Sequence, residues 1–206
     1  LTTAAALHRP GDHDAPLSEL RGCPTRGELV DAAVGVEWRY FLDRFRRSLV
    51  THLGLPGSTS GRLAAALAEM VDNVVEHAGL GDAPVGVVAY AVLDGGVSFE
   101  VVDLGRGVLS SLGENEEHAS LTSDADALRA AVISGASRRP GVEGRGFQDL
   151  LRALADMEGT LSFRSGAARL RLDGRGRGNR VASTSNSPRM RGFQMAVSAQ
   201  PTKTAW

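Results

Sequence analysis

The sequence predicts an α/β protein of the α+β type, a two-layer sandwich in which helices cover one face of a mixed sheet. Helical patterns come first, at about 28–54 and 60–78, and two apolar strands follow at 85–93 and 97–103. A third helical pattern, at 147–158, comes before another pair of short strands. Strands that pair as hairpins, with the helices in separate blocks, are typical of this fold class.

The helices are predicted from apolar residues that recur at steps of three and four. Gly54 is expected to end the first helix. Ser60 is the expected N-cap of the second helix, and Gly79 follows its last turn. A shorter helix is expected after Ser123, which can form a cap with Asp126 three residues later.

The strands are predicted from apolar runs between turn residues. An Asp-Gly-Gly turn at 94–96 joins the first two strands as a tight hairpin. Residues 160–165 and 168–173 have the pattern of a second hairpin. Residues 193–199 are the candidate for a last strand that returns to the sheet.

One domain accounts for most of the 206 residues. The Pro- and Gly-rich start predicts a flexible arm, and an Arg-, Gly- and Ser-rich stretch predicts a linker. The expected divisions are an arm at 1–27, the domain at 28–173 with a long loop at 108–140, a linker at 174–192, the candidate strand at 193–199 and a tail at 200–206.

The basic residues exclude two classes of enzyme. Of the 23 lysines and arginines only Lys203 is a lysine, and it does not follow the glycine pattern of a phosphate-binding P-loop. Schiff-base chemistry of a lysine in the body of the chain is also excluded, because Lys203 is the only lysine. Residues 1–173 hold 17 basic and 24 acidic residues, whereas residues 174–206 hold six basic residues and no acidic one. The acidic body disfavours a nucleic-acid surface.

Cysteine content and hydropathy exclude further classes of protein. Cys23 is the only cysteine, which excludes an internal disulfide and any multi-cysteine metal site. No apolar run approaches the roughly 18 residues that a membrane span needs. The first residues also lack the basic start and apolar stretch of a secretion signal. We therefore expect a cytoplasmic protein without a membrane partner.

Three motifs carry the chemistry, and the first lies on the second predicted helix. Glu69, Asn73 and His77 are each four residues apart, which places their side chains on one helical face. Taken alone, such a row is more often a solvated helix face than a site.

The second motif is Asp103 followed by Gly105 and Gly107, directly after an apolar strand. A carboxylate at a strand end can accept a hydrogen bond from the exocyclic amine of a base. The glycines let the backbone approach a flat ring or a phosphate without a Cβ clash. Alone, the same pattern is typical of a simple turn that ends a strand.

The third motif is the glycine-rich stretch at 141–146, immediately before a helix. Free backbone N–H groups and the positive end of the helix dipole suit a phosphate there. A flexible loop before a helix cap is the alternative interpretation.

Together and in this order, the three motifs resemble the ATP-binding domain of the GHKL superfamily. That superfamily includes the ATPase chain of DNA gyrase, the heat-shock chaperone ATPase, sensor histidine kinases, mismatch-repair MutL and the anti-sigma serine kinases. The stretch LAEMVDNVVEHAG is similar to its N box, VVDLGRG to its first Gly box and GVEGRGFQDLL to its second. The resemblance covers about 36–173, can extend to the candidate strand at 193–199, and implies a Bergerat-type ATP-binding fold.

The resemblance also implies roles for the matching residues. Asn73 would coordinate the Mg²⁺ that bridges the phosphates of ATP, and Glu69 would be the general base toward the attacking water or hydroxyl. Asp103 would accept a hydrogen bond from the adenine amino group. The loop 108–140 would order over the nucleotide as a lid. We expect His77 to pack or to form a hydrogen bond rather than to bind a metal.

The other implied roles belong to the two Gly boxes. Gly105 and Gly107 would let the loop pass close to the base. Gly144 and Gly146 would bring backbone N–H groups to the phosphates, and Arg145 between them could reach a phosphate or face solvent.

The chain also departs from the larger machines of the superfamily. Residues 1–35 are too short and too rich in Pro and Gly for a phosphoacceptor helix pair, and we expect no second domain that supplies a catalytic lysine. In type the chain is similar to the stand-alone anti-sigma-factor serine kinases. The resemblance therefore implies an ATP- and Mg²⁺-binding regulatory protein that phosphorylates or sequesters a protein partner, or slowly hydrolyses ATP.

Three alternatives remain open from the sequence. The protein could be a non-catalytic nucleotide sensor, in which ATP orders the lid and exposes a partner surface. The first helix, with Trp38, Tyr40 and Phe41, could form a homodimer or partner face, or could simply cover the sheet. The arginines of 175–191 could bind nucleic acid or an acidic partner, or could belong to a solvated linker.

Overall fold

The computed structural model describes residues 27–31, 36–77, 86–93, 95–141, 145–173 and 181–202. Within these residues, helices and strands follow one another along the chain in two blocks. Their bounds are β1 (Gly27–Asp31), α1 (Val36–Leu53), α2 (Gly57–His77), β2 (Gly86–Leu93), β3 (Gly96–Asp103), α3 (Val108–Leu112), the 3₁₀-helix η3 (Glu116–His118), α4 (Asp124–Ile133), α5 (Arg145–Ala155), β4 (Met157–Asp173) and β5 (Val181–Pro201).

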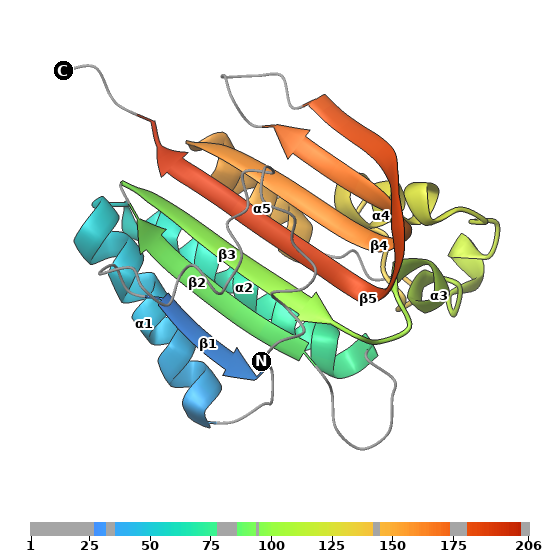
Figure 1. Ribbon diagram of the computed structural model, residues 1–206, viewed down its shortest axis with the longest axis horizontal. Helices are drawn as coiled ribbons and strands as arrows, with labels where there is room; N and C mark the ends of the chain where they lie inside the picture. The colour runs from blue at the N-terminus through green and yellow to red at the C-terminus, as the bar shows by residue number, and fades with distance from the viewer. Residues whose placement is uncertain are drawn as a thin grey trace.

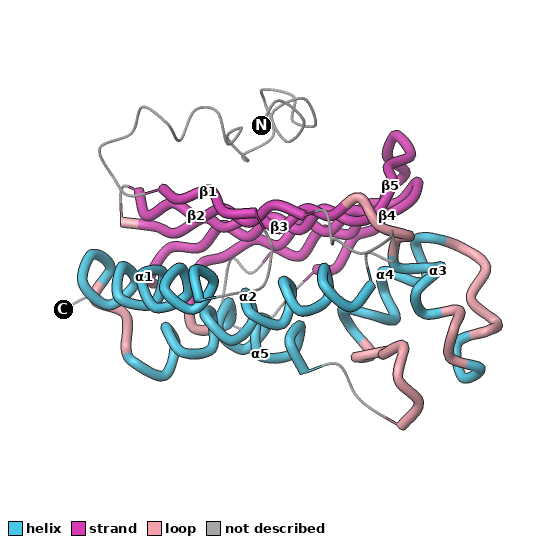
Figure 2. Tube along the Cα trace, turned by 90° about the horizontal axis from the view of Figure 1, so that it is seen from below, coloured by secondary structure: helices cyan, strands magenta, loops and turns pink. Residues whose placement is uncertain are grey.

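The strands form one sheet with the order β1-β2-β3-β5-β4 (Figure 1). The helices α1, α2 and α5 lie on one face of this sheet, so the protein has two layers (Figure 2). The predicted α+β two-layer fold is therefore confirmed. The structure differs from the prediction in one respect, because each of the four described strand pairings is antiparallel and the sheet is not mixed.

The first helix packs on the sheet through interlocking aromatic rings. Phe45 makes edge-to-face contacts with Tyr90 of β2 at 5.0 Å and with Phe99 of β3 at 5.7 Å between ring centroids. Trp38 and Phe41 are buried in the same core, whereas Tyr40 is 59% exposed. The apolar face of α1 thus covers the sheet.

None of the described helices has the length and hydropathy needed to cross a membrane.

The start of the domain differs from the prediction. The sequence predicts an arm up to residue 27 and a helix from about 28, but Gly27–Asp31 form β1 and the helix begins only at Val36. The strand pairs with β2 from Gly27 opposite Ala91 to Asp31 opposite Val87. β1 pairs with a strand that is distant in sequence, and such a pairing leaves no local signal. The predicted helix, which rests on the local pattern alone, therefore begins too early. The rest of the arm, residues 1–26, lies outside the described residues.

The second helix begins one turn earlier than expected. Gly57 is its first residue, and the backbone N–H of Ser60 already donates to the carbonyl of Pro56 at 3.0 Å. Ser60 is therefore not the N-cap. It is buried inside the first turn, where its hydroxyl donates to the carbonyl of Gly57 at 3.2 Å.

Two local predictions are confirmed. The turn around Gly95 joins β2 to β3 as a hairpin in which Leu93 faces Gly96. Ser123 caps α4 by accepting a hydrogen bond from the backbone N–H of Asp126 at 3.1 Å. Both signals depend only on residues close in sequence, and tertiary contacts do not override them.

The predicted second hairpin is wrong. Residues 157–173 form one strand, β4, which also takes Met157 and Glu158 from the end of the predicted helix. The two short patterns at 160–165 and 168–173 are separated by a bulge, because the register against β5 shifts around Gly166. The bulge interrupts the alternation of side chains and gives one bent strand the sequence pattern of two.

The predicted linker is also wrong. Residues 181–192 belong to β5, which continues through the correctly predicted strand at 193–199. Most of their side chains are exposed, although the backbone pairs with β4 along this half of β5. Pro188 lies at the bulge, between the paired residues Asn186 and Met190, where a strand needs no N–H donor. Residues 174–180, which hold the other arginines of this stretch, lie outside the described residues.

The bulge requires a glycine at position 166. Gly166 has φ of 57°, and a Cβ there would lie 2.2 Å from the carboxyl carbon of Asp124. That carboxylate cannot turn away without losing its hydrogen bond from the backbone N–H of Ala167 at 2.9 Å. Gly166→Ala is therefore expected to lower the free energy of unfolding by about 2–4 kcal/mol, measured by urea denaturation.

Gly61→Ala is the matched control for this substitution. Gly61 lies in α2, and a Cβ there meets nothing within 4 Å. Alanine is the better helix former, so this variant is expected to gain about 0.5–1 kcal/mol. Equal stability of Gly166→Ala and the native protein would contradict the described bend of β4.

Candidate functional site

A cavity of about 120 Å³ lies where the last residue of β3 meets α2, α5 and the segment after β3. Its walls come from seven helices and strands, namely α2, β3, α3, α4, α5, β4 and β5, and from the loops that follow β3 and α4. The polar lining residues are Glu69, Asn73, Asp103, Ser111, Ser137 and Arg138. The main apolar ones are Met70, Val108, Leu112, Phe147, Phe163 and Phe193.

Asp103 provides a buried carboxylate at the end of β3. Only 2% of the residue is exposed, and burial raises its pKa from 3.8 to about 6. Backbone hydrogen bonds from Gly105 and Phe193 act in the opposite direction, and the N–H of Gly105 donates to Oδ1 at 2.5 Å. At neutral pH the group is mostly ionised, so it can accept a further hydrogen bond from a ligand in the cavity.

Three phenylalanines form the apolar wall beside this carboxylate. Phe163 lies between the other two, with its ring centroid 5.1 Å from that of Phe147 and 5.6 Å from that of Phe193. They come from α5, β4 and β5, and all three are buried. A flat aromatic ligand with a hydrogen-bond donor on its edge fits such a combination of rings and one acceptor.

The helix α2 presents two polar side chains to the same cavity. Glu69 is exposed and Asn73 is half-buried, one turn further along. The amide nitrogen of Asn73 lies 3.9 Å from the sulfur of Met70, whereas its amide oxygen accepts no hydrogen bond from the described residues. The carboxylate of Glu69 likewise has no partner within the described part of the chain. Both acceptors are thus available to a ligand or a metal.

The backbone leaves β3 through a close approach at Gly107. This residue has φ of 85°, and a Cβ there would lie 2.9 Å from the hydroxyl oxygen of Ser165. That hydroxyl donates to the carbonyl of Gly192 at 2.8 Å and accepts from the backbone N–H of Val108 at 2.9 Å. Ser165 therefore joins β4, β5 and the start of α3 at one point beside the cavity.

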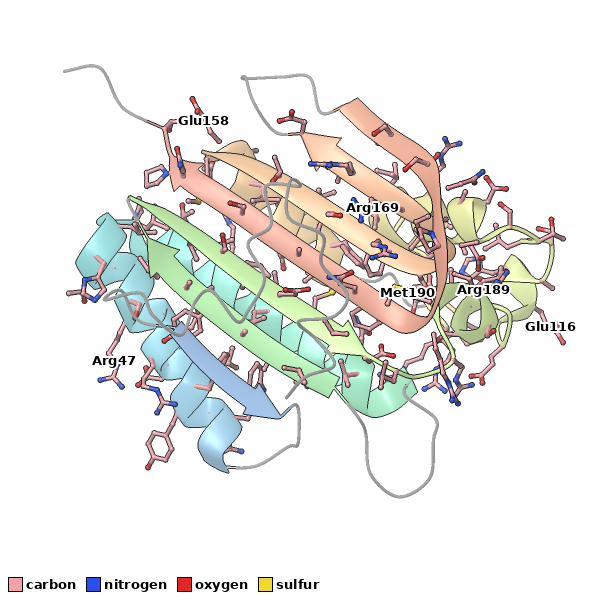
Figure 3. The ribbon with its side chains drawn as sticks, viewed as in Figure 1. Arg47, Glu116, Glu158, Arg169, Arg189 and Met190 are labelled. Atoms are coloured by element: carbon pink, nitrogen blue, oxygen red, sulfur yellow. The ribbon has the colours of Figure 1, made fainter. Side chains whose placement is uncertain are left out.

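The predicted lid at 108–140 is a structured segment that packs on the β4–β5 hairpin. It contains α3, η3 and α4. Besides the contact of Asp124 with Ala167, a guanidinium nitrogen of Arg129 in α4 donates to the hydroxyl of Thr184 in β5 at 2.6 Å. Figure 3 shows Arg189 and Met190 where β5 bends beside these helices. The residues expected to form a linker therefore support the lid.

A second, polar cavity of about 380 Å³ lies between the lid and the hairpin. It shares Gly107 and Val108 with the first cavity, so the backbone of these two residues separates the two spaces. Arg106 and Asp124 contribute charges to its walls.

The structure brings together four of the predicted site residues, namely Glu69, Asn73, Asp103 and Gly107. Gly105 lies in the adjoining turn, where its N–H is used by Asp103, and it does not line the cavity. Gly144 lies outside the described residues. Arg145 and Gly146 begin α5, but their side-chain surroundings are not described, and the same holds for His77 at the end of α2.

Several lining residues are not predicted from the sequence to belong to a site. Phe147, Phe163 and Phe193 are recognisable there only as apolar members of a helix and two strands. Ser165 and Arg138 carry no local signal that separates them from other polar residues of a strand and a loop. The one signal that could have found the phenylalanines is their position one to three residues from the Gly boxes or the strand ends.

A magnesium ion fits this donor set only with help from a ligand. The described residues contain no group of three His, Cys, Asp or Glu side chains that could hold a metal. Mg²⁺ commonly takes one or two protein oxygens and completes its shell with waters and substrate phosphates. The available amide oxygen of Asn73 suits one such position.

Comparisons with known proteins find no matching family, and the structural likeness that they give is weak. A scan against models of protein families finds no match, and a search of curated proteins finds no relative. Among solved structures, the chain is similar to the B-subunit of the DNA gyrase from Myxococcus xanthus, with 14% sequence identity and a TM-score of 0.36. The match covers 80% of this chain and 44% of that one, so the chain spans less than half the length of the gyrase chain.

The burial of Asp103 predicts how stability depends on pH. The pKa of Asp103 is raised in the folded state, so the protonated carboxyl group contributes to the free energy of unfolding. This contribution is full below about pH 4 and is lost as the pH rises through about 6. A pKa moved from 3.8 to about 6 corresponds to about 3 kcal/mol. The stability of Asp103→Asn relative to the native protein is therefore expected to be up to about 3 kcal/mol greater at pH 7 than at pH 4, measured by denaturant unfolding.

Asp43→Asn is the matched control, because it removes an exposed carboxylate from α1. Its stability relative to the native protein is expected to change by less than about 1 kcal/mol over the same pH range. A pH-independent effect of Asp103→Asn would show that the carboxylate is not desolvated as described.

Proposed function

We propose that the chain binds ATP with Mg²⁺ in the cavity at the end of β3 and acts as a regulatory protein of the GHKL type. The observation that carries this proposal is the buried carboxylate of Asp103 beside three phenylalanines. An adenine ring would lie against the phenylalanines, and its amino group would donate to Asp103. Gly107 contributes its backbone to the same cavity.

The phosphates would extend toward α2. There Asn73 would supply one oxygen ligand to the Mg²⁺ that the phosphates hold, and the bound ion would neutralise phosphate charge during transfer. Glu69 lies one helical turn away, so its carboxylate could take the proton from an attacking water or hydroxyl. The oxygen of that nucleophile would bond to the γ-phosphorus as the bond to ADP breaks. The stretch 144–146 would supply backbone N–H groups to the same phosphates.

In this proposal the acceptor is a protein hydroxyl, as in the serine kinases that the chain resembles, or water. Sequestering a protein partner while ATP is bound is compatible with the same site. The alternative is a sensor without catalysis, in which ATP orders the lid and exposes a partner surface. The position of Glu69 at the cavity, one helical turn from Asn73, favours the catalytic version.

Binding of ATP is the first test. Calorimetry with Mg²⁺ should detect binding by the native protein and a loss of at least tenfold in affinity for Asn73→Ala, because the metal ligand is gone. Asp103→Asn should lose at least tenfold as well, since a hydrogen bond to a charged acceptor is worth about 1.5–3 kcal/mol. Asp72→Asn, an exposed neighbour on α2 that does not line the cavity, should bind as the native protein does.

The role of Glu69 separates the enzyme from the sensor. Glu69→Gln keeps the size of the side chain but removes the base. Turnover of ATP, followed as phosphate release or transfer to a protein, is expected to fall by about 10²–10⁴ while ATP affinity changes less than about twofold. A folded native protein that binds ATP without any turnover would favour the sensor, and turnover unchanged by Glu69→Gln would assign the base elsewhere.

A further inference from the structure

The turn after α3 places one carboxylate between two arginines. Oε1 of Glu114 accepts a hydrogen bond from Arg106, and Oε2 accepts one from Arg138 at 3.1 Å. Arg106 precedes α3 and Arg138 follows α4, so the two arginines come from opposite ends of the lid. Glu114 therefore links the two ends of the segment from 106 to 138, next to a second link in which the amide nitrogen of Asn115 donates to the carbonyl of Ser137 at 3.0 Å.

The two arginines reach both cavities. Arg138 lines the first cavity together with Asn73 and Asp103, and Arg106 lines the second, polar one. The backbone of Gly107 and Val108 is common to both. A polyanion that enters the first cavity beside α2 thus meets Arg138 at the same wall where Glu114 now holds it.

The chemistry of this arrangement is that of a phosphate site. Guanidinium groups bind carboxylate and phosphate oxygens with the same planar fork of N–H donors. A carboxylate bears one negative charge, whereas a triphosphate bears several. The side chains of Glu114, Arg106 and Arg138 are 40%, 31% and 28% exposed, so the ion pairs are partly solvated and each is worth little. A phosphate chain can therefore replace Glu114 at low cost.

The size of the first cavity supports an exchange of this kind. Sites that enclose a small-molecule ligand usually measure about 300–1,000 Å³, whereas this cavity measures about 120 Å³. Part of its wall consists of lid residues, among them Ser111, Ser137 and Arg138. Releasing Arg138 from Glu114 would let its side chain move and widen the cavity, while Asn115 still holds the carbonyl of Ser137.

We propose that Arg138 is a phosphate-binding residue of the nucleotide site and that Glu114 is its internal competitor, displaced when a triphosphate binds. The proposal rests on the proposed function, because it assigns the phosphates of ATP to the side of the cavity that Arg138 lines. Glu114 lowers the affinity for phosphates and holds the guanidinium group of Arg138 until they arrive. Adenosine, which has no phosphate, gains nothing from its removal.

The test compares Glu114→Gln with Glu116→Gln. Both variants remove one negative charge from the lid, but Glu116 lies two residues further, points away from the lid in Figure 3 and has no described ion-pair partner. Calorimetry with Mg²⁺-ATP, adenosine and inorganic tripolyphosphate gives the readout. Each of the two ion pairs of Glu114 can change an equilibrium constant by up to about fivefold. Glu114→Gln, which removes both, is therefore expected to raise the affinity for ATP and tripolyphosphate by about three- to twentyfold and to leave that for adenosine unchanged.

A second variant tests the arginine itself. Arg138→Gln should lower the affinity for ATP and tripolyphosphate at least tenfold without changing that for adenosine. The proposal is overturned if Glu114→Gln weakens ATP binding, if Glu116→Gln raises it equally, or if Arg138→Gln binds ATP as the native protein does.

The three probes distinguish this proposal from the proposed function. Tripolyphosphate binding that depends on Glu114 and Arg138, without any adenosine binding, would support the exchange and overturn the adenine site. Adenosine and ATP binding with no effect of either lid variant would support the adenine site and overturn the exchange. No binding of any probe by the folded native protein and its variants would overturn both.

Discussion

The pairing of β5 with both β3 and β4 determines where every part of the site lies. Phe193 in β5 faces Asp103 on one side and Ser165 on the other. This single row places the buried carboxylate, the aromatic wall and the hydroxyl that anchors Val108 at neighbouring positions. A slip of one residue would turn every side chain of β5 to the opposite face of the sheet. The cavity therefore depends on the register of β5 against β3 and β4, and the long pairing of these strands stabilises that register.

Charge is distributed around this row in two different ways. Asp103 is buried without an arginine among the causes of its altered pKa, so its ionised form is kept at a cost to stability. The lid, by contrast, pairs Glu114 with two arginines at the surface, where opening the pairs costs little. A costly fixed acceptor beside an adjustable polar wall is typical of a ligand site rather than of a structural core.

Local sequence signals predict much of the helical layer and of the site. The helical pattern of α2, the turn at Gly95 and the cap at Ser123 depend on residues within one or two turns of each other. Asn73 and Asp103, which the sequence singles out by spacing and by position at a strand end, line the same cavity in the structure. These features depend on the nearby chain, so they survive in the fold.

The sheet could not be predicted as well, because its pairings join residues far apart. β1 has only five residues, and its pairing with β2 has no counterpart in the local pattern. The first half of β5 is rich in serine and contains Pro188, so its composition is typical of a loop. Ser165 becomes a site residue only through hydrogen bonds to two other strands or loops. The missing information in each case is the identity of the partner strand.

The central place of β5 has a consequence for how the chain folds. β3 precedes β5 by the whole lid, α5 and β4, yet Val97 must find Ala199 before the sheet is complete. Until then the inner edge of β3 is an open row of backbone donors and acceptors, and such edges promote association between chains. Contacts so distant in sequence also slow folding. The helical layer and the β2–β3 hairpin can form early, but the pocket exists only after the last step of assembly.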